Sequence, residues 1–157
     1  MKRSNFECSC ILACRLSNSP KLDGSWDLLF TTNDGSSAGK IGPFVGAVQQ
    51  DITLGNQAYI NYVKLGPVLA FLGATWENLG NNKWKVIFVD ISLKILGIQL
   101  INKKFPGNTT GIWRMTYLDD DFRVLYAAGG KTDTATKNKD GKVENIYILK
   151  KKVDRSS

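Results

Sequence analysis

The chain has 157 residues, a length that fits one domain able to bury roughly two-thirds of the surface of its extended chain. With 43% hydrophobic residues, 15 glycines and 4 prolines, its composition is that of a globular protein and excludes a disordered chain. No apolar run approaches the roughly 20 residues that a membrane-spanning helix needs. The net charge of +7 favours an anionic partner, such as nucleic acid, an acidic lipid surface or an acidic protein, and is equally consistent with a role in solubility alone.

Residues 1–20 differ in composition from the rest and contain all the cysteines: Cys8, Cys10 and Cys14. Their odd number and close spacing predict no disulfide framework, and three thiolates in a chain without histidine leave a fourth metal ligand undefined. The segment is either a faint signal-like stretch, interrupted by charges, or a short amphipathic helix. We assign residues 1–20 to an N-terminal extension or remnant of a targeting or helical segment, residues 21–152 to the domain and residues 153–157 to a tail.

The first strand is expected within residues 22–32. Side chains alternate between the two faces of a sheet, so Trp26, Leu28 and Phe30 share one face and Asp27 points away. Gly24 permits a tight start to the strand, and Trp26 can plug the closed end of a barrel.

The rest of the chain predicts short strands separated by turn signals every eight to twelve residues. Strands are expected at residues 45–53, 58–65, 68–77, 84–91, 112–118, 122–127 and 145–150, whereas residues 92–101 fit either a strand or a helical turn. Without helices between strands, the pattern indicates an antiparallel all-β sandwich or barrel of about eight strands. We favour the barrel because large aromatic residues recur on the faces expected to point inward: Trp26, Phe30, Tyr62, Trp84, Phe88 and Tyr117.

Two sequence stretches carry a resemblance to a known family. Residues 112–124 read Ile-Trp-Arg-Met-Thr-Tyr-Leu-Asp-Asp-Asp-Phe-Arg-Val, and residues 22–32 read Leu-Asp-Gly-Ser-Trp-Asp-Leu-Leu-Phe-Thr-Thr. Together with residues 40–43 and 48–52 and the strand around Asn61, they resemble the plastid lipid-associated protein/fibrillin family. The resemblance implies a lipocalin-like antiparallel β-barrel that binds a hydrophobic molecule at plastoglobules or thylakoid membranes in the chloroplast.

The resemblance also implies how the barrel closes. Arg123, from a late strand, is expected to lie over the ring of Trp26 at the closed end, a cation–π contact worth about 0.5–2 kcal/mol. Asp119 would hold the guanidinium group or cap the turn before Phe122. Gly24, Trp26, Asp119 and Arg123 are therefore expected to be structural residues and not a reaction centre. The basic run at residues 150–152 is explained by a solvated tail.

The first functional hypothesis is a monomeric, non-catalytic protein that binds a lipid, prenylquinone or carotenoid-like ligand. The candidate cavity wall comprises Phe30, Tyr62, Phe71, Trp76, Phe88, Met115 and Tyr117, although each of these also suits an ordinary core. Apolar residues beside paired cations in residues 95–105 suggest peripheral contact with a membrane or lipid surface through Lys103, Lys104 and Phe105.

Three alternatives belong to other classes. An enzyme acting on a hydrophobic substrate would lack histidine for proton transfer and shows no nucleophile or phosphate-loop motif, so Asp90 is the one carboxylate to suspect. A scaffolding module would have a filled barrel. A nucleic-acid binder would need a basic stripe, whereas the lysines and arginines are scattered. We expect no cofactor, no metal and no nucleic-acid partner.

Overall fold

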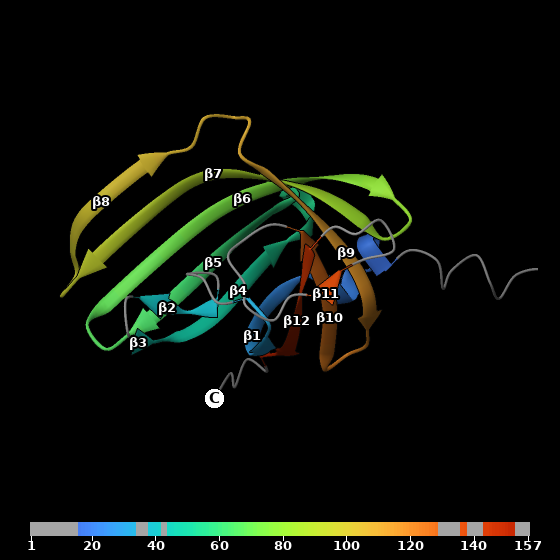
Figure 1. Ribbon diagram of the computed structural model, residues 1–157, viewed down its shortest axis with the longest axis horizontal. Helices are drawn as coiled ribbons and strands as arrows, with labels where there is room; N and C mark the ends of the chain where they lie inside the picture. The colour runs from blue at the N-terminus through green and yellow to red at the C-terminus, as the bar shows by residue number, and fades with distance from the viewer. Residues whose placement is uncertain (1–15, 34–37, 42–43, 129–135, 138–142, 153–157) are drawn as a thin grey trace, which may run out of the picture.

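The computed structural model describes residues 16–33, 38–41, 44–128, 136–137 and 143–152. Within them, eight strands close into a ring in which each strand is antiparallel to the next and the last pairs with the first (Figure 1). In order around the ring they are β1 (Gly24–Thr31), β4 (Ala47–Thr53), β5 (Ala58–Leu65), β6 (Val68–Gly80), β7 (Lys83–Ile95), β9 (Thr110–Leu118), β10 (Phe122–Ala128) and β12 (Val143–Lys151). This up-and-down closure, which is the architecture of lipocalins, confirms the predicted all-β barrel.

Shorter elements complete the described structure. β2 (Lys40–Ile41) pairs with β3 (Phe44–Val45), β8 (Ile98–Lys104) pairs with β7, and β11 (Thr136–Lys137) pairs with β12. The described helices are single 3₁₀ turns: η1 (Leu16–Asn18), η2 (Pro20–Leu22) and η4 (Leu54–Asn56). None of them is long and apolar enough to cross a membrane.

Residues 92–101 form strands, which decides between the two predicted alternatives. β7 continues to Ile95, and the chain reverses at residues 96–97 into β8. Leu96 and Gly97 both have positive φ angles, 52° and 81°, as a tight two-residue hairpin turn requires.

Residues 16–22 seal one end of the barrel. The indole Nε1 of Trp26 donates to the carbonyl of Leu22 at 2.9 Å, and that of Trp84 donates to the carbonyl of Ser17 at 3.0 Å. Trp84 also stacks on Trp76, with ring centroids 4.3 Å apart. Residues 16–20, which the sequence analysis assigned to an extension, thus contact the barrel core. Residues 1–15, with the three cysteines and the proposed helix, lie outside the described residues.

Two β-bulges correct the inward placement of Phe30 and Tyr117. Leu28 and Phe30 face successive residues of β12, so Leu29 is an extra residue and the alternation reverses beyond it. Thr116 is the corresponding extra residue in β9, between Met115 and Tyr117. Phe30 is consequently 53% exposed and Tyr117 is 49% exposed, although alternation from Trp26 and Trp113 predicts that both point inward.

Tyr62 and Phe71 also point outward. The predicted alternation of β5 is correct, but the face carrying Tyr59, Asn61 and Val63 is the buried one. Tyr62 instead meets Phe71 of β6 edge-on outside the barrel, with ring centroids 5.2 Å apart. The sequence analysis placed Tyr62 inward with the other large aromatic residues, whereas its neighbour Asn61 is the residue that points inward.

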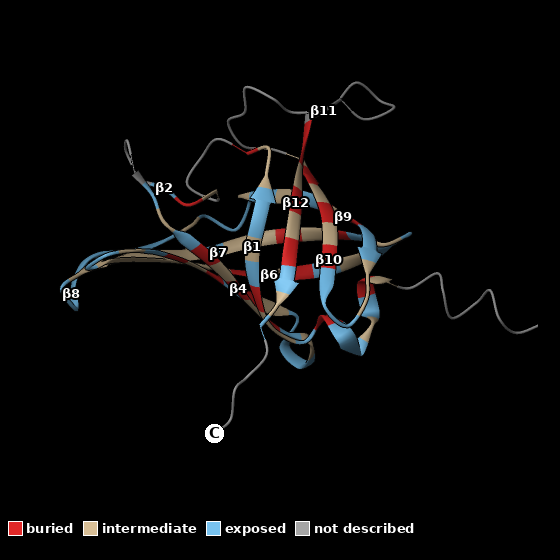
Figure 2. Ribbon diagram, turned by 90° about the horizontal axis from the view of Figure 1, so that it is seen from below, coloured by how far each residue is buried: buried red, intermediate tan, exposed pale blue. Residues whose placement is uncertain are grey.

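Part of the sheet continues beyond the barrel. We call residues 68–73, 90–95 and 98–104 the wing; they form the ends of β6 and β7 together with β8, and they project to one side of the ring (Figures 1 and 2). Every residue of β8 is exposed, including Ile98 at 66% and Leu100 at 59%. The wing is therefore an edge with apolar side chains in solvent.

The bulge in β1 gives a direct test of this fold. Trp26→Ala should lower the free energy of unfolding by about 3–5 kcal/mol, because it empties a fully buried site. Phe30→Ala, four residues along the same strand, should change it by less than about 1 kcal/mol, because that ring is half in solvent. Urea unfolding measures both values, and equal large losses would contradict the bulge.

Candidate ligand cavity

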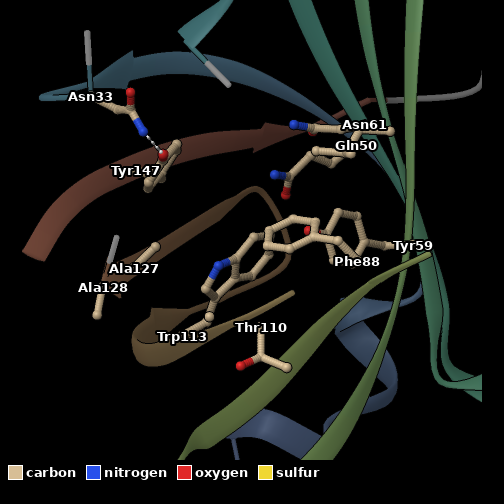
Figure 3. Close-up of a pocket in the computed structure, with 12 residues that line it drawn as sticks. Asn33, Gln50, Tyr59, Asn61, Phe88, Thr110, Trp113, Ala127, Ala128 and Tyr147 are labelled. Atoms are coloured by element: carbon tan, nitrogen blue, oxygen red, sulfur yellow. Dashed lines mark hydrogen bonds between the residues drawn. The ribbon is translucent and has the colours of Figure 1, made fainter. Parts of the chain in front are cut away.

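A cavity of about 260 Å³ occupies the barrel interior (Figure 3). Its lining comes from loop residue Asn33 and from strands β4, β5, β6, β7, β9, β10 and β12: Gln50, Tyr59, Asn61, Leu72, Phe88, Thr110, Gly111, Trp113, Ala127, Ala128 and Tyr147. Cavities that bind small molecules usually measure about 300–1,000 Å³, so this one holds a ring system or a short chain segment.

The predicted wall residues separate into three groups. Phe88 lines the cavity, whereas Trp76 and Met115 are buried in the core. The other predicted wall residues lie on the outer face of the sheet: Phe30, Tyr62, Phe71 and Tyr117. They do not meet at one site, because the bulges and the orientation of β5 turn them away from the interior.

One wall of the cavity is apolar and aromatic. Leu72, Phe88 and Trp113 contribute their side chains, and Ala127 leaves space beside them. The ring of Trp113 also packs against Tyr59, with centroids 4.8 Å apart. Such a wall suits the flat or branched apolar part of a ligand.

The polar wall comes from β4 and β5 and adjoins the apolar one. Gln50, Tyr59 and Asn61 are exposed by only 3%, 2% and 4%, and Gln50 lies directly opposite Asn61 in the β4–β5 register. Near them, Asn33 donates from Nδ2 to the hydroxyl of Tyr147 at 2.6 Å. Amides and phenols buried in this way are the groups that the sequence analysis missed. The sequence feature that could have identified them is a single polar residue on an otherwise apolar strand face, such as Gln50 between Val48 and Ile52.

Arg123 joins the closed end to this polar wall. Its guanidinium lies 4.9 Å from the ring centroid of Trp26, as the sequence predicts, and its Nη2 donates to Oε1 of Gln50 at 2.5 Å. The side chain is fully buried, which lowers the pKa of Arg123 to about 9 and leaves it protonated at neutral pH. Because arginine can only donate, the Gln50 oxygen faces it and the Gln50 nitrogen is turned toward the cavity (Figure 3).

Asp119 caps a turn. Its Oδ1 accepts from the backbone N–H of Asp121 at 2.8 Å and of Phe122 at 2.5 Å, and its Oδ2 accepts from the hydroxyl of Tyr117 at 2.5 Å. These bonds, that of Tyr117 first, lower the pKa of Asp119. Of the two predicted roles, the structure therefore supports capping.

Lys151 is a structural residue that sequence reasoning assigned to a solvated tail. Its ammonium lies 4.6 Å from the ring centroid of Trp26 and donates to the carbonyls of Lys21 and Asp23. Gly24, with a φ of 104°, lets the chain turn beside it, in a backbone region that glycine alone adopts readily. Trp26 thus makes cation–π contacts with two side chains, and the contact with Lys151 adds to the one predicted for Arg123.

The remaining candidate residues lie outside the barrel. Asp90 borders a shallow outer groove of about 440 Å³ beside Phe71 and does not line the interior cavity. Lys103 and Lys104 are exposed on the wing, and Phe105 is half-buried, with its ring centroid 6.3 Å from that of Phe88. No cluster of metal-binding side chains occurs among the residues that the structure describes.

Comparisons with known proteins found similarity to solved structures alone. No protein family model and no curated protein matches the chain. Among solved structures, the chain is similar to bovine odorant binding protein. A deswapped triple mutant is 12% identical, with 85% of this chain and 76% of that chain covered, and a complex with a selenium-containing odorant is 11% identical, with 98% and 78% covered. Both have a TM-score of 0.43, so the closed strand order of this chain, and not the similarity, establishes its barrel.

Proposed function

We propose that the protein is a non-catalytic carrier that holds a hydrophobic small molecule in the barrel cavity and contacts a lipid surface through the wing. The observation that carries this proposal is an apolar face that runs from the cavity wall onto the wing. With the wing seated on a lipid surface, a ligand could pass along such a face without crossing water.

Strand register establishes this continuity. Leu72 lines the cavity, so the alternate residues Ala70 and Val68 of β6 lie on the same face. Directly paired residues of neighbouring strands share a face, which extends it to the β7 residues Ile91, Leu93 and Ile95 and to the β8 residues Ile98, Ile101 and Lys103. The opposite face of the wing carries Leu69 and Phe71 together with the polar side chains Asp90, Ser92, Lys94, Gln99 and Asn102. The wing is thus amphipathic, and its apolar side is the one that continues into the cavity.

The size of the cavity bears on the class of ligand. About 260 Å³ accommodates a small ring system or a short chain but not a whole long-chain molecule. A lipid, prenylquinone or carotenoid-like molecule would place one end in the cavity and the rest along the apolar face. Asp90, the carboxylate suspected from the sequence, borders the outer groove and does not line the cavity.

We infer that the cellular setting is the plastid, at plastoglobules or thylakoid membranes. This inference rests on the resemblance of residues 22–32 and 112–124 to plastid lipid-associated proteins, and the Trp26–Arg123 contact agrees with that resemblance. We further propose that the carrier works as a monomer.

Blocking the cavity should abolish ligand binding. The neutral fluorescent probe N-phenyl-1-naphthylamine should gain fluorescence with the wild-type protein, and Ala127→Phe should remove that gain, because Ala127 is buried in the cavity wall. Ala47→Phe, the same substitution at an exposed position of β4, is the control and should bind normally. Equal binding by both variants would show that the probe sits elsewhere.

The two wing lysines should differ in their effect on membrane binding. Lys103 pairs with Ile91 on the apolar face, whereas Lys104 pairs with Asp90 on the polar face. Lys103→Glu should weaken co-sedimentation with phosphatidylglycerol-containing vesicles at least about fivefold at low salt, since one interfacial lysine is worth about 1 kcal/mol. Lys104→Glu, with the same charge change, should have a smaller effect. If neither variant differs from wild type, the wing does not dock on lipid.

A further inference from the structure

The polar wall of the cavity has hydrogen-bonding capacity that the described residues do not use. The hydroxyl of Tyr59 and Oδ1 of Asn61 are buried without a partner among them. An unpartnered buried polar group costs about 1–3 kcal/mol, so such groups usually have a ligand or water as partner. Both residues line the cavity, and of the two atoms only the Tyr59 hydroxyl can donate to a ligand oxygen, because Oδ1 of Asn61 only accepts.

The groups that face the cavity are mainly donors. Burial raises the pKa of Tyr59 far above its usual range, so the phenol keeps its proton and can donate it. The amide nitrogens of Gln50 and Asn61 point to the same side, into the space bordered by Tyr147 and Ala127 (Figure 3). The bond from Arg123 holds Gln50 in this orientation. A wall of converging donors is complementary to an acceptor oxygen.

Arg123 adds a positive field behind this wall. Its Nε and Nη1 have no hydrogen-bond partner in the described part of the chain, and its bond to Gln50 is to a neutral amide. An ammonium or guanidinium charge in a low-dielectric interior acts over several ångströms and favours nearby oxygens that carry negative charge or a strong dipole. The positive charge therefore stabilises a bound carbonyl or carboxylate oxygen and gives a pure hydrocarbon no comparable stabilisation.

We propose that the ligand carries a carbonyl or carboxylate oxygen that lies against Gln50, Tyr59 and Asn61, with its apolar part beside Trp113 and Phe88 and leaving along the wing. This assignment rests on the proposed carrier function and narrows it. Quinones, oxygenated isoprenoids and fatty acids meet the requirement, whereas unsubstituted hydrocarbons do not. The oxygen enters first and the tail remains toward the apolar face.

A matched ligand series tests this assignment. An alkane, a methyl ketone and a carboxylic acid of equal chain length are each used to displace N-phenyl-1-naphthylamine from the wild-type protein and from Tyr59→Phe, Asn61→Leu and Tyr62→Phe. The ketone or the acid should displace the probe at least about tenfold more effectively than the alkane, and Tyr59→Phe should reduce that advantage about fivefold, as expected for one hydrogen bond. Tyr62→Phe removes the same hydroxyl from the outer face and should change nothing. A larger gain for the acid than for the ketone assigns a carboxylate, and the reverse assigns a carbonyl.

Stability measurements separate binding from folding. Tyr59→Phe and Asn61→Leu each remove a buried polar group without a partner, so they should raise the melting temperature of the ligand-free protein while weakening the oxygenated ligands. Equal displacement by all three ligands in the wild type, or equal losses for all three in Tyr59→Phe, would overturn the assignment and leave the carrier function standing. Failure of the probe and of every ligand to bind would overturn both.

Discussion

Arg123 connects the two halves of the barrel interior. On one side it lies over Trp26, which also bonds to Leu22 and carries Lys151 on its ring, so that the closed end is sealed by packing and cation–π contacts. On the other side it bonds to Gln50 and thereby fixes the direction of an amide in the cavity wall. A residue expected from the sequence to be purely structural thus also shapes the site, although it is not among the residues that line the cavity.

The bulges change the curvature of the sheet, and the wing is the part of the sheet that extends past the closed ring. Extra residues at Leu29 and Thr116 increase local twist and turn Phe30 and Tyr117 outward. Beyond the barrel, β7 pairs with β8 in place of β9, and β8 has no further partner among the described strands, so the inner face of the sheet emerges into solvent as an apolar surface. The same strands therefore supply a cavity wall at Leu72 and an exposed edge at Ile98.

Strand positions and the closure were predictable from the sequence, whereas the cavity was not. Alternation and turn residues located the eight barrel strands, and the motif around Arg123 predicted its contact with Trp26. Alternation cannot reveal a bulge, because one extra residue reverses every side chain after it without changing composition. Nor does apolarity identify the inner face of a strand whose interior holds Gln50 or Asn61, since the partner of Gln50 is Arg123, a residue distant in the chain.

The central claim is that the end around Trp26 is structural and that ligands bind at the other end of the interior. The tryptophan indole N–H signals in a ¹H–¹⁵N NMR spectrum test it most directly, because Trp113 lines the cavity while Trp26 and Trp84 are hydrogen-bonded at the closed end. Titration with the methyl ketone should shift the Trp113 signal and leave those of Trp26 and Trp84 in place. Shifts at Trp26 and Trp84 with an unchanged Trp113 signal would contradict the account.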